Sequence, residues 1–171
     1  AADKYLPVEA TGVIEAPALR VLVSRKRVGA GYRLVSAFDT GARRILVDRG
    51  FVGVAADLPA PPEGEVTVTG NLHWPEDRLP STPENDVAGN TWFARDIAPM
   101  AERLGTEPLL VIARAVSPPE RGVTPLPVDT RSIPNDHLEY AITWFSLAAI
   151  WAIMTGAIIR RERRAAKGTK T

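Results

Sequence analysis

An uncharged run near the C-terminus constrains this chain more than any other feature. It extends from Ala141 to Ile159 and reads AITWFSLAAIWAIMTGAII. As an α-helix rising about 1.5 Å per residue, it would be roughly 28 Å long, close to the thickness of a bilayer's hydrocarbon core. Buried helices of soluble proteins are usually shorter and carry a polar stripe. The run therefore predicts a transmembrane helix, and the rest of the chain is interpreted around it.

The charges on either side of this run predict its orientation. Acidic residues precede it, whereas the residues that follow are mostly basic: Arg160, Arg161, Arg163, Arg164, Lys167 and Lys170. Lys and Arg remain on the cytoplasmic side of a membrane. We therefore expect a cytoplasmic C-terminus and an exported domain before the helix. Export needs a signal peptide or an earlier membrane helix, so we also expect such a segment upstream of residue 1.

The residues before the helix show a mostly β pattern. Val66 and Val68 alternate with Thr67 and Thr69, as in a half-buried strand. Further apolar, β-branched stretches are separated by Gly- and Pro-rich turns. The strands that we expect are Val8–Ile14, Leu19–Ser24, Tyr32–Phe38, Arg44–Val54, Glu65–His73 and Glu107–Val116.

One amphipathic helix interrupts this β pattern. Its apolar face would consist of Ile97, Met100, Ala101 and Leu104, with Asp96 as a possible cap and Gly105 at its end. The fold class is therefore mainly β (α+β): a small antiparallel sheet or partly closed barrel with one short helix, plus the C-terminal transmembrane helix.

The expected organisation has four parts. Residues 1–117 form an extracytoplasmic β-rich domain, and residues 118–136 form a proline-rich spacer. Residues 137–160 form the transmembrane helix, and residues 161–171 form a basic cytoplasmic tail. All 15 prolines precede residue 137, and prolines stiffen and extend a spacer.

Composition excludes several functions. The chain has no cysteine, which removes disulfide scaffolds, Cys-based zinc sites and thiol redox pairs. Its two Met and two His are too few and too scattered for a copper carrier. Residues 1–137 hold 18 acidic and 15 basic residues, so they lack the basic surface of a nucleic-acid binder. No phosphate-binding loop or paired carboxylates with a base stand out, and we expect no enzyme.

His137 is the main candidate for a functional residue. On a helix it would share one face with Tyr140, Ala141, Trp144 and Ala148. An imidazole above an aromatic membrane face suits a large, flat, apolar ligand with a metal centre, because imidazole is a common ligand of haem iron. The alternative is a polar residue at a helix start beside ordinary aromatic anchors.

Other candidates have structural interpretations. We expect His73, at the end of a strand, to be a surface or half-buried histidine. The basic cluster of Arg25, Lys26, Arg27 and Arg33 predicts a solvated hairpin tip, although it could instead meet a carboxylate or an anionic lipid. Gly50 and Gly53 favour a bulge or close packing. Trp92 and Phe93 are expected in the core.

Four segments in chain order give the sequence a family resemblance. They are Gly31-Tyr32-Arg33, Ile45-Leu46-Val47-Asp48-Arg49-Gly50-Phe51, the segment Asn90–Arg95, and Pro134-Asn135-Asp136-His137-Leu138-Glu139-Tyr140-Ala141-Ile142-Thr143-Trp144-Phe145. Together they resemble the surfeit locus protein 1 family of cytochrome c oxidase assembly factors, most closely its alphaproteobacterial members. Members of that family have two membrane helices, and only the second is recognisable here.

The resemblance implies a non-enzymatic role in maturing subunit I of haem–copper cytochrome c oxidase. The cofactor implied is haem a, bound or handed over transiently, and the family's proposed iron ligand corresponds to His137, with Tyr140 and Trp144 as pocket neighbours. The implied partners are subunit I, haem a synthase and the lipid bilayer, at the bacterial inner membrane with the soluble domain periplasmic. The alternative is a scaffold that holds subunit I or haem a synthase without touching haem.

Overall fold

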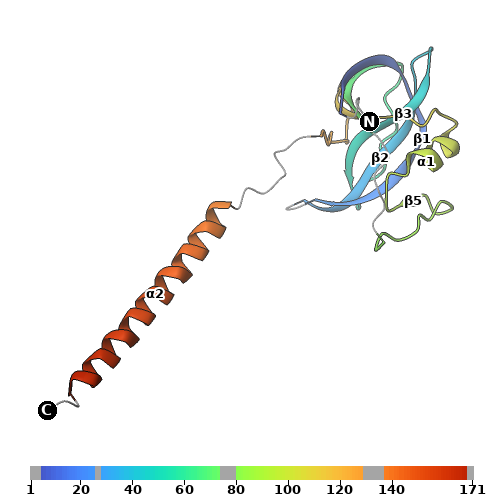
Figure 1. Cartoon of the computed structure of the whole chain (residues 1–171). Helices are drawn as coiled ribbons and strands as arrows, with labels where there is room; N and C mark the ends of the chain where they lie inside the picture. The colour runs from blue at the N-terminus through green and yellow to red at the C-terminus, as the bar shows by residue number, and fades with distance from the viewer. Residues whose placement is uncertain (1–4, 26–27, 74–79, 129–136, 169–171) are drawn as a thin grey trace. The chain divides into compact units, whose positions relative to one another are not determined.

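The computed structural model describes residues 5–25, 28–73, 80–128 and 137–168 (Figure 1). The chain divides into two compact units, Ala1–Val128 and Asp129–Thr171. The first is called the β unit here, and each unit is described by itself.

The described residues of the β unit form six strands. They are β1 (Pro7–Arg25), β2 (Gly29–Asp39), β3 (Arg44–Gly53), β4 (Glu65–His73), β5 (Thr91–Trp92) and β6 (Leu110–Ser117). Five of them close into a ring in the order β1-β2-β3-β6-β4, because β1 pairs with both β2 and β4. The pairing of β3 with β6 is parallel, whereas the other pairings around the ring are antiparallel. The prediction of a mainly β, barrel-like domain is confirmed, and the barrel is closed.

Strand β1 is longer than the sequence pattern predicts. The two strands expected at Val8–Ile14 and Leu19–Ser24 are one continuous strand with a register shift between Glu15 and Leu19. Before the shift β1 pairs with both β2 and β4, and after it β1 pairs with β2 and with the short β5. The irregular stretch therefore bends one strand around the barrel, where the sequence suggested a break.

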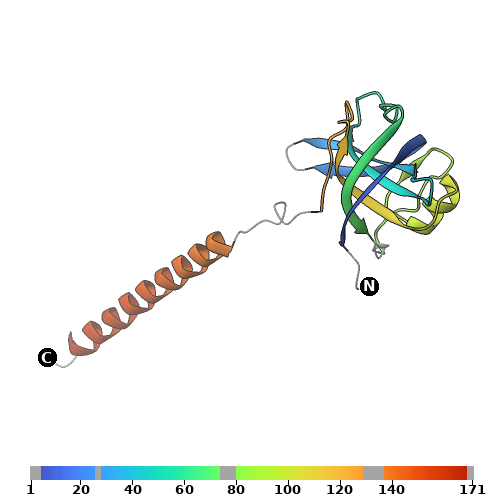
Figure 2. The ribbon, with the colours of Figure 1, turned by 90° about the horizontal axis from the view of Figure 1, so that it is seen from above.

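Two apolar cores lie on opposite faces of the strands. The first draws on all five barrel strands and fills the barrel: Ile14, Phe38, Ile45, Val47, Val66, Val68, Val111, Ala113 and Val116. The second packs α1 (Ile97–Leu104) and Trp92 against the other face: Leu19, Val21, Val35, Ala37, Leu46, Trp92, Ile97, Met100, Ala101, Leu104 and Leu110. Figure 2 shows α1 at the side of the barrel.

Helix α1 follows the predicted pattern, apart from its cap. Its buried residues are the four predicted ones, and Gly105 ends it in the left-handed conformation at φ 64°. Asp96 occupies the N-cap position, but its side chain makes no capping hydrogen bond. The side-chain amide of Asn85 donates to the Asp96 carboxylate instead.

The residues that follow β6 differ from the expected spacer. Residues 118–128 belong to the β unit, because Thr124 pairs with Phe51 on β3 and Val123 is buried beside Leu34 and Val52. We call residues 118–128 the strap. The rest of the expected spacer, residues 129–136, lies outside the described residues.

The second unit contains one long helix, α2 (His137–Gly168). Its segment His137–Arg164 is long and apolar enough to cross a membrane, with a mean hydropathy of 1.9. None of the apolar window is buried within the structure. Within the described part of the chain, this exposure differs from that of a core helix, which is mostly buried.

Candidate functional site

The N-terminal end of α2 carries the residues that the sequence singled out. His137 is the first residue of the helix, and Tyr140 and Trp144 follow on the same face, 66% and 68% exposed. Tyr140 and Trp144 line a shallow groove of about 330 Å³ together with Glu139 and Thr143. His137 precedes Glu139, the first lining residue, by two positions and does not line the groove.

Between Leu138 and Ile159, exposed apolar side chains lie on every side of α2. Large exposed side chains surround it: Leu138, Ile142, Phe145, Leu147, Ile150, Trp151, Ile153, Met154, Ile158 and Ile159. A helix that is apolar all round is stable only when lipid or other helices cover it. The Thr143 hydroxyl is satisfied within the helix, because it donates to the carbonyl of Glu139 at 2.8 Å. The groove is therefore lined by two aromatic rings, one hydroxyl that is bonded within the helix, and the Glu139 side chain.

His73 differs from the sequence prediction. It ends β4 as expected but is buried, with 3% of its surface exposed, and its ring lies 5.9 Å from that of Tyr5. The His73 side chain is therefore packed inside the β unit and is not at its surface. Among the described residues, no group of three or more His, Cys, Asp or Glu is placed to hold a metal ion.

The Asp48 carboxylate forms a second polar centre, inside the β unit. Asp48 is fully buried on β3, 2.7 Å from Arg33 Nε and 3.5 Å from Arg95 Nη1. Its Oδ1 also accepts the N–H of Gly50 at 3.1 Å. Burial raises the pKa of Asp48 above its ordinary value, against the opposing effect of the two guanidinium groups. Arg33, predicted to be solvated, is therefore part of this ion-paired cluster, because its strand position faces Asp48.

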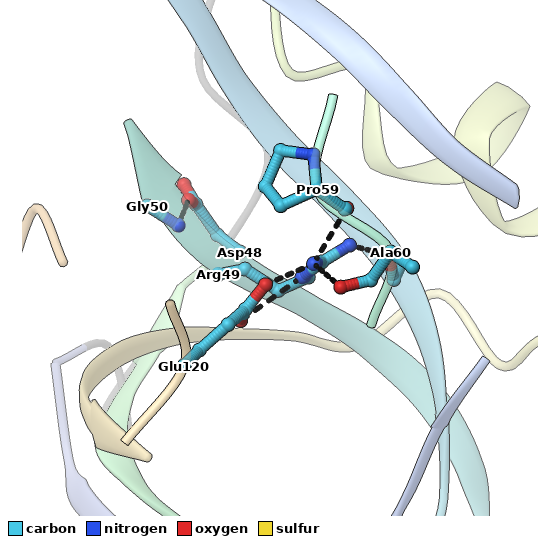
Figure 3. Close-up of polar contacts among 7 residues, drawn as sticks. Asp48, Arg49, Gly50, Pro59, Ala60 and Glu120 are labelled. Carbon is cyan, nitrogen blue, oxygen red and sulfur yellow. Dashed lines mark hydrogen bonds and ion pairs between the residues drawn. The ribbon is translucent and has the colours of Figure 1, made fainter. Parts of the chain in front are cut away.

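Arg49 points away from Asp48, as successive residues of a strand do. Its side chain is completely buried and pairs with the Glu120 carboxylate of the strap (Figure 3). It also donates to the carbonyls of Pro59 and Ala60, at 3.1 and 3.2 Å. One guanidinium thus joins β3 to two segments that have no regular structure of their own.

Gly50 and Phe51 extend this attachment of the strap. Phe51 and Thr124 exchange two backbone hydrogen bonds, of 2.7 and 2.9 Å. Gly50 has a φ of 126°, and a Cβ built on it would lie 2.3 Å from the Thr124 carbonyl oxygen. Only glycine fits such a conformation and such a close approach. The prediction that Gly50 serves a bulge and close packing is confirmed.

Arg33 adds a further contact to the strap. Its Nη2 donates to the carbonyl of Leu126 at 2.8 Å. The run from Asp48 to Phe51 is therefore a structural centre that holds the strap to the barrel. The sequence predicted a strand here but not its contacts with the strap. The separation of 71 residues between Arg49 and Glu120 hid the pairing, since no local pattern connects them.

The class of protein follows from this geometry. The described residues combine a closed β barrel, an ion-paired strand that holds a strap, and a helix long and apolar enough to span a membrane. The model of the SURF1 family matches residues 1–149. The chain belongs to the SURF1 family.

Three curated relatives match between 61% and 73% of this chain. Surfeit locus protein 1 of Takifugu rubripes is 34% identical over 140 residues, which cover 71% of this chain and 58% of the relative. Surfeit locus protein 1 of Homo sapiens is 38% identical over 111 residues, covering 61% and 36%. The SURF1-like protein of Monosiga brevicollis is 36% identical over 137 residues, covering 73% and 51%. The matches thus span about a third to three fifths of these relatives' length.

Proposed function

We propose that this protein is a membrane-anchored assembly factor for haem–copper cytochrome c oxidase, acting by binding and not by catalysis. Membership of the SURF1 family is the observation that carries the proposal. The structure adds a domain whose polar centre, from Asp48 to Phe51, is engaged in holding the fold together. Such a centre suits a binding and positioning role better than a reaction.

The proposed cargo is haem a, bound or handed over while subunit I matures. The His137 imidazole would coordinate the iron, and the rings of Tyr140 and Trp144 would lie against the macrocycle. The position of His137 about one turn before Tyr140 supports this arrangement. A single helix offers one wall only, so the opposite wall would come from subunit I, haem a synthase or another helix.

The proposed location is the bacterial inner membrane, with the β unit on the periplasmic side. The charges around α2 support this orientation, because Arg160, Arg161, Arg163 and Arg164 follow the apolar segment directly. The lipid bilayer is then the partner of most of the α2 surface. Subunit I and haem a synthase are the protein partners that the proposal requires.

A second candidate is a scaffold that holds subunit I or haem a synthase without touching haem. The exposed apolar side chains on every side of α2 favour it, since they can pack against partner helices in any direction. In this case His137 would bond to a partner or to lipid headgroups. The two functions differ in whether the purified protein carries haem.

An absorption spectrum distinguishes them. The full-length protein would be produced together with the enzymes of haem a synthesis and purified in mild detergent. His137→Ala and Trp144→Ala would be compared with wild type, and Phe145→Ala would serve as the matched control. Phe145 is a neighbouring aromatic residue, 76% exposed, that does not line the groove.

The haem-binding proposal expects a haem a band in wild type and Phe145→Ala, with loss of the band in His137→Ala and weakening in Trp144→Ala. Absence of the band from all four proteins, with subunit I still co-purifying, would rule out direct binding and leave the scaffold. A band of equal strength in all four would retain haem binding but remove His137 and Trp144 from the site.

A further inference from the structure

Two neighbouring barrel strands each carry a β-bulge, and the extra residue is an arginine in both. On β3 the register against β2 shifts so that Leu34 pairs with Gly50 and Val35 with Asp48, which leaves Arg49 without a partner position. On β6 the register against β4 shifts between Thr69 and Gly70, and Arg114 is left out in the same way. Bulges re-aim side chains and occur often near functional sites.

The two re-aimed arginines line the same cavity. β3 and β6 are neighbours in the barrel, and the cavity beside them has a volume of about 310 Å³. That volume is at the lower end of the range for small-molecule sites. Its other lining residues are mostly apolar: Ala115, Val116, Pro119, Glu120, Val123 and Pro125.

The charges of the two arginines are balanced differently. Arg49 is neutralised by the Glu120 carboxylate. Arg114 donates to the neutral amide oxygen of Asn71 at 3.0 Å, and no carboxylate pairs with it among the described residues. Asn71 is itself held, because its amide nitrogen donates to the carbonyl of Tyr5 at 2.9 Å. An exposed guanidinium, oriented by Asn71 and without a carboxylate partner among the described residues, therefore borders a cavity with mostly apolar walls.

We propose that this cavity binds an apolar monocarboxylate, with the carboxylate on Arg114 and the apolar body against Val116, Val123 and the strap prolines. A planar guanidinium matches a carboxylate through two parallel hydrogen bonds. One unneutralised cation balances one negative charge, and the nearby Glu120 carboxylate disfavours a dianionic phosphate. The site lies in the β unit and is independent of the haem proposal for α2.

Octanoate is a suitable probe because it is soluble and has one carboxylate on an apolar chain. Binding would be measured by calorimetry to the full-length protein in phosphatidylcholine nanodiscs, with empty nanodiscs subtracted. Octan-1-ol and octyl phosphate would be measured alongside, to separate the contribution of the ligand's apolar chain from that of its charged group. We expect saturable octanoate binding, with octan-1-ol and octyl phosphate at least about tenfold weaker.

Four variants test the location of the site. Arg114→Gln should weaken octanoate binding about tenfold or more, and Arg114→Lys should weaken it less, because the charge remains. Ala115→Trp should block the cavity with Arg114 intact. The matched control is Arg121→Gln, at an exposed strap arginine that does not line the cavity, and it should bind octanoate like wild type.

Several results would overturn the proposal. Absence of saturable octanoate binding to wild type would do so, as would equal binding by wild type, Arg114→Gln and Ala115→Trp. Tighter binding of octyl phosphate would show that the anion is not a carboxylate. An equal loss in Arg121→Gln would show a general charge effect at the surface and not a site.

Discussion

Replacing Arg49 with methionine is the most informative perturbation of the β unit. Methionine retains an apolar stem of similar length but removes the guanidinium that holds the strap. The Glu120 carboxylate, 6% exposed, then loses its cationic partner while remaining buried. The carbonyls of Pro59 and Ala60 lose their donor at the same time.

The expected cost follows from the buried pair. Removing one partner of a buried ion pair destabilises a protein by about 3–5 kcal/mol, because the remaining charge is left uncompensated. This is a large part of the roughly 5–15 kcal/mol that stabilises a typical domain. Arg49→Met/Glu120→Met removes both charges, and should cost at least about 2 kcal/mol less than the sum of the single variants. Arg121→Met, at an exposed strap position, should stay within about 0.5 kcal/mol of wild type.

Thiol labelling measures these effects, because these 171 residues contain no cysteine. The variant Val123→Cys places a thiol that reports release of the strap, and Ala113→Cys places one in the fully buried barrel core that reports unfolding. We expect Arg49→Met to expose the strap thiol to labelling at lower urea than the barrel thiol. Additive single-variant costs, or wild-type protection of the strap thiol in Arg49→Met, would refute the role assigned to the pair.

Two further predictions concern the β unit. Gly50→Ala should destabilise it by more than about 1 kcal/mol in urea titration, since its Cβ would meet the Thr124 carbonyl. Gly53→Ala, with no atom within 4 Å of its Cβ, should be nearly neutral, and equal effects would contradict the close-approach argument. Hydrogen bonding to Arg43 lowers the pKa of Glu107 below its ordinary 4.5, so the pair stabilises the fold above that pH and less as pH falls through the lowered pKa. Glu107→Gln should remove this part of the acid sensitivity, and because both side chains are exposed to solvent, high salt should reduce the difference from wild type.

Elements with a clear local pattern were predictable from the sequence. The alternation of Glu65–His73 predicted β4 with its observed bounds, and the apolar spacing of Ile97–Leu104 predicted α1. The long uncharged run predicted the membrane-length helix α2. In each case the pattern extends over enough residues to outweigh the weak structural preferences of single residues.

Features that depend on distant pairing were not predictable. Strand β5 contains two residues, too few for any period, and exists because it pairs with Arg20 and Val21 of β1. Arg33 was predicted to be solvated because its partner Asp48 is on the next strand, where no local pattern reveals it. Gly50 indicated the bulge on β3, but the Arg49–Glu120 pair and the bulge at Arg114 are set by the register of the closed barrel, which local sequence does not encode.

The residues from Asp48 to Phe51 hold the fold together, so a substitution among them can abolish function without removing a binding site. Alternation along β3 sends Asp48 to the face packed with Arg33 and Arg95, and Arg49 to the face that holds Glu120. A substitution at Asp48 or Arg49 therefore disturbs the β unit. A loss of haem retention in such a variant can follow from this disturbance and not from a lost haem contact. Protection of the thiol in Val123→Cys separates the cases: loss of haem with the strap released is indirect, whereas loss with the strap in place implicates a site. His137 and Arg114 belong to different units, so their variants test the two binding proposals separately.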